Sequence, residues 1–181
     1  MNKISGKDLN VIVCNFCSVK VLMDTDALIK LAKSSLKELI VSNISVAIPV
    51  SVSNESVREG KAKGYSDALL IEKNIRGGKI NVVKAKKKEA KMMIKGLQLH
   101  SGEVDCLYIF AQGSYDSVVS DDRKFLEIID TIGIPFLTPS ALVVYLYKSG
   151  KISISTVNEC LEKLRAMISR EEYHSAKDGL R

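Results

Sequence analysis

Apolar and polar residues along the chain follow two alternating patterns. Short aliphatic runs predict strands at 19–23, 46–48, 80–83, 117–120 and 134–137. Between them, apolar residues recur at helical spacing, which predicts helices over 27–40, 49–59, 65–75, 101–112, 140–148 and 156–168, with a lysine-rich helix after residue 83 and another helix after residue 122. Strands that alternate with helices indicate an α/β sandwich with a mostly parallel sheet and right-handed crossovers.

The length of 181 residues suits one compact domain with additional terminal elements. We expect residues 1–18 to form an N-terminal extension, 19–150 the main domain, and 151–181 a C-terminal helix followed by a frayed polar tail. The 46% of hydrophobic residues suffices for a sizeable core and argues against disorder.

The positive charge is concentrated in one segment. The chain has 27 Lys+Arg and 21 Asp+Glu, a formal net charge of +6. Residues 79–95 contain seven lysines and the single acid Glu89, so this segment carries the whole excess. A localised basic surface indicates a polyanionic partner such as nucleic acid, and the alternative is a solvated helix face.

The cysteines and the N-terminal apolar run suggest no further chemistry. Cys14 and Cys17 have the spacing of metal or redox pairs, but no second pair completes a zinc site, so we expect a structural or incidental role. The run 11–23 is broken by Asn15 and Lys20 and is too short to span a membrane. We therefore expect a protein of the reducing cytoplasm that does not enter a membrane.

Acidic residues follow the predicted strands. Asp24 comes directly after the first strand, and Asp121 and Asp122 follow the fourth. Glu55 lies early in the helix after the second strand, and a further helix carries acids in its first turn, for which Ser101 is a plausible N-cap. Those acids are Glu103 and Asp105.

The carboxyl ends of parallel strands meet in one crevice, which would bring these acids together. Taken singly, each acid could be an ordinary helix cap. Several carboxylates at one crevice repel one another and require a cation, and oxygen ligands without nearby His or Cys suit Mg²⁺ or Mn²⁺. Such a centre would activate water and neutralise a phosphodiester, and no serine-hydrolase, P-loop or dinucleotide motif offers other chemistry.

Four ordered blocks resemble the PIN domain family, specifically its toxin-like ribonucleases of the VapC type. The blocks are Met23-Asp-Thr-Asp-Ala-Leu-Ile29, Ile48-Pro-Val-Ser-Val-Ser-Asn-Glu55, Ser101-Gly-Glu-Val-Asp-Cys-Leu107 and Val119-Ser-Asp-Asp-Arg-Lys-Phe125, followed by a similar Gly133–Thr138 segment. The resemblance spans roughly residues 19–148. It implies a three-layer α/β/α sandwich in which 19–150 is the catalytic domain of an Mg²⁺- or Mn²⁺-dependent endoribonuclease.

The resemblance also implies roles for particular residues. Asp24, Glu55, Asp105 and Asp122 match the four family acids, while Glu103 competes with Asp105 for metal and Asp121 is a neighbour or co-ligand of Asp122. By the resemblance, Thr25 and Asp26 occupy the position whose polar side chain often supports the metal site. The charge distribution separately predicts that the basic segment holds the RNA backbone, through Lys84, Lys86, Lys87, Lys88 and Lys91. Many relatives pair with an antitoxin protein that blocks the site, and homodimers are frequent.

Two other functions compete with this one. Asp24-Thr-Asp26 imitates the first motif of haloacid-dehalogenase-like phosphatases, with Asp121-Asp122 as a possible last motif, but Glu55 and Asp105 would then have no role. A non-catalytic module that binds RNA or protein through the lysines is the other alternative.

Overall fold

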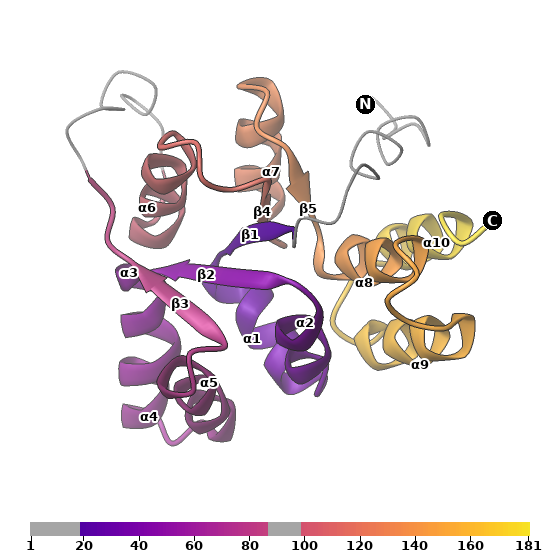
Figure 1. The fold of residues 1–181 in the computed structure, drawn as a ribbon, viewed down its shortest axis with the longest axis horizontal. Coiled ribbons are helices and arrows are strands. Elements are labelled where there is room, and N and C mark those ends of the chain that lie inside the picture. Colours follow the sequence, from indigo (N-terminus) through magenta and orange to yellow (C-terminus); the bar gives the residue numbers. More distant parts are fainter. Residues whose placement is uncertain (1–18, 87–98) are drawn as a thin grey trace.

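A computed structural model describes residues 19–86 and 99–181. Helices and strands alternate through most of this part of the chain (Figure 1). Along the chain they are β1 (Lys20–Met23), α1 (Thr25–Lys33), α2 (Lys37–Asn43), β2 (Ser45–Pro49), α3 (Val50–Ser53), the π-helix η2 (Asn54–Glu59), α4 (Gly60–Ala62), α5 (Ser66–Arg76), β3 (Ile80–Val83), α6 (Ser101–Phe110), β4 (Ser117–Val119), α7 (Arg123–Thr131), β5 (Phe136–Leu137), α8 (Pro139–Lys148), α9 (Ile154–Leu164) and α10 (Arg170–Asp178).

The strands form one sheet in the order β3-β2-β1-β4-β5. Every pairing is parallel, and β1 lies at the centre, with Val21 opposite Val46 on one side and Ser117 on the other. The chain therefore crosses over after each strand, and all five strands present their carboxyl ends at one edge. This confirms the predicted three-layer α/β/α sandwich.

Alternation along the strands divides the core into two layers. Val21 and Met23 of β1 face the core shared with α1, α2, α5, α8 and α9. Leu22 points to the opposite face, where it packs against α6 and α7. The buried strand positions of both layers are mostly apolar, as expected for parallel strands buried on two sides, with Ser117 of β4 as a polar exception.

The structure corrects the predicted helix boundaries in two places. The apolar run 27–40 forms two helices rather than one, because the chain turns at Ser35, which has a positive φ of 60°. The expected N-cap Ser101 is the first residue of α6 instead. His100 occupies the cap position, where its backbone N–H donates to Glu103 Oε2 at 2.7 Å.

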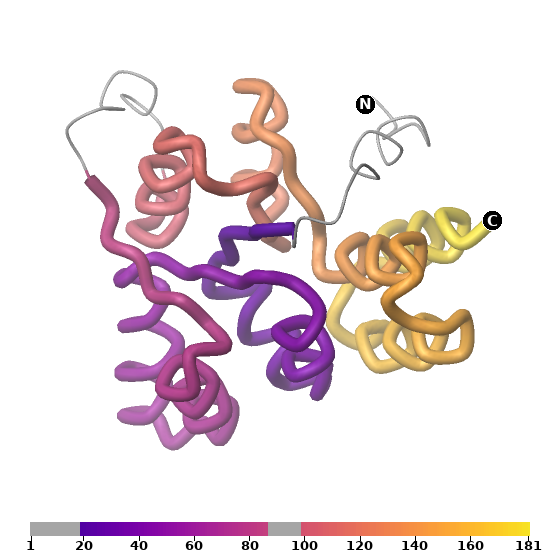
Figure 2. Tube along the Cα trace, viewed as in Figure 1, coloured from indigo at the N-terminus to yellow at the C-terminus, as the bar shows by residue number. Residues whose placement is uncertain are grey.

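The expectation of a frayed C-terminal tail was wrong. Residues 170–178 form α10, which begins at the cap Ser169 and buries Ala176. Figure 2 shows α10 returning beside α8, and Lys177 Nζ donates to Asn158 Oδ1 of α9 at 2.7 Å. A few buried contacts thus order a segment whose composition is strongly polar.

Several expectations fall on residues outside the described part of the chain. These are the N-terminal extension with Cys14 and Cys17 and most of the lysine-rich helix, including Lys87, Lys88 and Lys91. Within the described residues, no helix has both the length and the apolar character needed to cross a membrane.

Candidate active site

A cavity of about 230 Å³ opens at the carboxyl edge of the sheet. Five of its lining side chains are carboxylates from four segments of the chain, and neither lysine nor arginine is among the described residues that line it. The lining residues are Asp24, Thr25, Asp26, Glu55, His100, Gly102, Glu103 and Asp122. The fold thus brings distant acids together, and His100 is the one basic side chain among the described residues that line the cavity.

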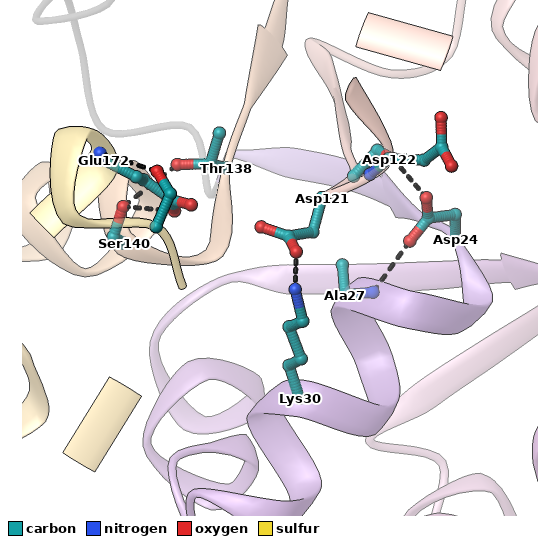
Figure 3. Close-up of polar contacts among 10 residues, drawn as sticks. Asp24, Ala27, Lys30, Asp121, Asp122, Thr138, Ser140 and Glu172 are labelled. Carbon is teal, nitrogen blue, oxygen red and sulfur yellow. Dashed lines mark hydrogen bonds and ion pairs between the residues drawn. The ribbon is translucent and has the colours of Figure 1, made fainter. Parts of the chain in front are cut away.

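Asp24 lies at the centre of the sheet edge and is 4% exposed. Its backbone N–H donates to Val119 O at 3.1 Å, which joins the ends of β1 and β4. Its carboxylate caps α1 by accepting the Ala27 N–H at 2.8 Å, and it also accepts the hydroxyl of Ser120 (Figure 3). Asp24 therefore has the structural role of a helix cap while one face of its carboxylate remains on the cavity.

Burial raises the pKa of Asp24 from 3.8 to about 7. The hydrogen bonds from Ser120 and Ala27 lower this pKa, and the negative charges of Asp26 and Glu103 raise it further. Burial also raises the pKa of Glu103, helped by the charges of Asp122 and Asp26. The ionised forms of Asp24 and Glu103 are thus disfavoured in this cavity, which is the electrostatic condition that a bound divalent cation relieves.

Glu55 reaches the cavity from η2, a π-helical segment. Its Oε2 accepts the hydroxyl of Thr25 at 2.6 Å, and its Oε1 accepts the hydroxyl of Ser101 at 3.1 Å. A π-helical turn changes the direction in which its side chains point relative to a regular α-helix, and such turns often occur at functional sites. Hydroxyls from α1 and α6 thereby hold Glu55 between the two helices.

Gly102 lets α6 approach α3 and η2 closely. A Cβ at this position would lie 3.1 Å from Val52 Cγ2 and 3.7 Å from both Glu55 Oε2 and Thr25 Oγ1. Any larger side chain would therefore press against the residues that position Glu55.

Asp122 caps α7 at the other side of the cavity. Its Oδ1 accepts the Phe125 N–H at 2.9 Å, and its own N–H donates to Ser120 Oγ at 3.1 Å. Because Ser120 also donates to Asp24, one hydroxyl connects the two acids at the ends of β1 and β4. The loop after β4 is thereby fixed relative to Asp24.

Two of the predicted metal ligands lie beside this cavity rather than on it. Asp105 Oδ2 accepts the hydroxyl of Ser51 at 2.8 Å. Asp121 forms an ion pair with Lys30 of α1, and its side chain is 11% exposed (Figure 3). Neither is among the lining residues, whereas Glu103 is.

The chemistry of the donor set fits a hard divalent cation. Carboxylate oxygens converge from β1, η2, α6 and the loop after β4, and such oxygens are the ligands that Mg²⁺ and Mn²⁺ take. Among the described residues, no three acidic, histidine or cysteine side chains converge closely enough to form a ready-made metal site. The hydroxyl contacts leave the acids uncompensated in charge.

A family profile described as a PIN domain matches residues 20–177. The chain belongs to the PIN domain family. PIN domains are typically nucleases and generally use divalent metals, so membership favours phosphodiester hydrolysis over the phosphatase alternative. The matched region runs through α9 and nearly to the end of α10. A search of curated proteins gave no match.

Sequence reasoning missed two residues that line the cavity, His100 and Gly102. His100 directly precedes the predicted helix, and a cap residue held through its backbone N–H leaves no side-chain signature in the sequence. Gly102 lies inside a predicted helix, where glycine is disfavoured. A glycine inside a predicted helix was therefore the one sequence signal that two helices approach each other closely at this position.

Proposed function

We propose that this PIN domain is an Mg²⁺- or Mn²⁺-dependent endoribonuclease. The observation that carries the proposal is the cavity lined by five carboxylates, with raised pKa values at Asp24 and Glu103. Asp24, Glu103 and Asp122 would hold the cation, with Glu55 on the adjoining wall. When bound, the cation would offset the charge of the phosphodiester and acidify a water molecule.

The protein's own residues would position the reactants. Glu55 is held by two hydroxyls and so can orient water without itself carrying an ion pair. Ser120 fixes Asp24 relative to Asp122. Thr25 holds Glu55 in place, and Asp26 adds an exposed negative charge at the rim.

Lysines after β3 support RNA as the substrate. Lys84 and Lys86 are exposed and directly follow the carboxyl end of β3, so they lie at the same sheet edge as the acids. Contacts with the phosphate backbone would use these side chains, and a partly basic surface beside an acidic cavity suits a negatively charged polymer.

Cleavage of a labelled single-stranded RNA, with Mg²⁺ or Mn²⁺ and with EDTA, tests the proposal. We expect wild-type cleavage only with the metal, and a loss of at least about a hundredfold in Asp24→Asn and Glu55→Gln. Asp130→Asn, which removes an exposed acid from α7, is the matched control and should retain activity. Metal-dependent cleavage that persists in both site variants would refute the assignment.

A toxin role with an antitoxin partner, a VapC-like specificity and a homodimer are further proposals that rest on the resemblance. Co-expression with a candidate antitoxin and the mass in solution would test them. Inhibition of RNA cleavage by that partner is the expected result, and cleavage unaffected by a bound partner would refute the toxin role.

A further inference from the structure

A second cavity, of about 360 Å³, lies between the end of α9 and the start of α10. We call it the α9–α10 groove, and it is lined by Arg165, Ser169, Arg170, Tyr173 and His174. It shares no lining residue with the acidic cavity. Its residues are cationic, aromatic or hydroxylic, which is the composition of sites that bind phosphate and stack bases.

The charged side chains that line this groove are Arg165 and Arg170, and Glu171 and Glu172 directly follow Arg170 in the chain. The Arg165 guanidinium lies 5.4 Å and Lys177 Nζ 5.5 Å from the centre of the Tyr173 ring. The facing acid is Glu162, which accepts the Tyr173 hydroxyl and lies 3.5 Å from Arg165 Nη1. Arg170 is exposed, and among the described residues no carboxylate is within ion-pair distance of it. At least one arginine is therefore free to meet an external anion.

The groove also offers a surface for stacking. The His174 ring is exposed and meets the edge of Tyr173 at a centroid distance of 5.8 Å and an interplanar angle of 78°. Arg165, with its side chain 68% exposed, presents a guanidinium plane over the same tyrosine. Unpaired bases stack on both imidazole and guanidinium planes.

Hydrogen bonds place the start of α10 at the carboxyl edge of the sheet. Glu172 Oε1 accepts the hydroxyl of Ser140 at 2.6 Å, and Ser140 Oγ lies 3.0 Å from Thr138 Oγ1. Thr138 directly follows β5, the edge strand. In Figure 3, Asp121 lies between this trio and the acids of the cavity, Asp24 and Asp122.

The acidic cavity consequently has basic groups on both sides. Lys84 and Lys86 follow β3 at one edge of the sheet, and the acids follow the central strands. The α9–α10 groove is lined by one face of α10, and Glu172 on another face of α10 contacts α8, the helix that follows β5 at the other edge. A strand of nucleic acid that crosses the carboxyl edge would meet these three features in sequence.

We propose that the α9–α10 groove binds a phosphate and a base of single-stranded RNA on the far side of the acidic cavity from Lys84 and Lys86. This inference rests on the proposed ribonuclease function. The arginines contact the phosphate, and His174 stacks on the base. Only an RNA long enough to reach from the acidic cavity to the groove contacts both. The groove's contribution to RNA affinity therefore depends on RNA length.

Fluorescence anisotropy with labelled single-stranded RNA in EDTA tests the proposal, using the full chain and oligonucleotides of about 4 to about 16 nucleotides. For the longest RNA we expect Arg165→Gln/Arg170→Gln to weaken binding about tenfold or more. For this double variant, the slope of log affinity against log salt concentration should decrease in magnitude by about 0.7 for each phosphate contact that is lost. His174→Ala should weaken binding with little change of slope, and the shortest RNA should bind all variants alike.

The matched control is Arg58→Gln/Arg76→Gln, which removes the same charge from exposed positions in η2 and α5. The proposal would be overturned if both double variants lost RNA affinity equally, or if the loss of affinity in the groove variant did not depend on RNA length. Arg170→Gln alone replaces the double variant if circular dichroism shows a disturbed fold. If the wild type cleaves RNA with Mn²⁺ but the groove variants bind RNA as tightly as wild type, the groove proposal is refuted and the ribonuclease function stands. If the groove variants lose affinity in a length-dependent way but the wild type does not cleave RNA, the groove proposal stands and the ribonuclease function is refuted.

Discussion

Replacing Asp24 by asparagine should stabilise the metal-free protein at neutral and alkaline pH. The pKa of Asp24 rises from 3.8 to about 7 on folding, chiefly because the carboxyl group is buried. The folded protein therefore keeps a proton that the unfolded chain loses as the pH rises above about 4. This stabilising contribution is complete below pH 4 and is lost as the pH rises through 7, where ionisation costs up to about 4 kcal/mol.

Asparagine has no charge to desolvate, and its Oδ1 can still accept the Ala27 N–H that Asp24 accepts at 2.8 Å. The amide cannot accept the Ser120 hydroxyl in the same way, which costs about 1–2 kcal/mol. We therefore expect Asp24→Asn to be more stable than wild type by about 2–3 kcal/mol at pH 8, and equal or slightly less stable at pH 4.

Urea unfolding followed by circular dichroism, from pH 4 to pH 8.5 in EDTA, measures this difference. The stability difference between Asp130→Asn, at an exposed position, and wild type should not change comparably with pH. A stability difference between Asp24→Asn and wild type that does not change with pH would refute the reasoning. So would an Asp24→Asn protein that is less stable than wild type at pH 8.

Three further predictions concern packing, charge and metal. Gly102→Ala should lower stability by about 1 kcal/mol in thermal melts and impair RNA cleavage, because its Cβ would lie 3.1 Å from Val52 Cγ2. Adding Val52→Ala should remove this contact and restore cleavage, while the loss of buried Val52 methyl groups keeps stability below that of wild type. Lys30→Met should cost about 1–2 kcal/mol in urea unfolding because it leaves the Asp121 carboxylate unpaired, and adding Asp121→Asn should recover most of the loss. Mn²⁺ at about 100 times its Kd should stabilise the wild type by about 2.7 kcal/mol at pH 8, and calorimetry that shows no shift would contradict a metal site.

The sequence was sufficient for features that depend on local pattern. Aliphatic runs identified the five strands, and acids directly after two of them, such as Asp24 and Asp122, lie on the cavity because strand ends share one edge. Other features depend on tertiary contacts. The turn at Ser35 leaves no clear composition signal, and the π-helical segment that carries Glu55 approaches α6 at Gly102, a contact that the sequence pattern does not reveal.

The C-terminal helix illustrates the same limit. Its sequence is polar enough to predict fraying, yet α10 is held by Ala176 in the core and by the Glu172–Ser140 hydrogen bond. Both contacts are made with elements formed by earlier parts of the chain. The α9–α10 groove depends on this docking, and a pattern of single residues therefore could not indicate it.

Asp121, one of the two predicted ligands off the cavity, has a different kind of partner from Asp24 and Glu55 on it. Hydroxyls of Ser120 and Thr25 hold Asp24 and Glu55, and a hydroxyl fixes a carboxylate without changing the net charge of the site. Asp121 is instead held by the ammonium group of Lys30 and lies off the cavity. A lysine within the cavity would satisfy the acids electrostatically and remove the advantage of binding a cation. Holding the acids by hydroxyls positions them in advance and leaves their charge for the metal.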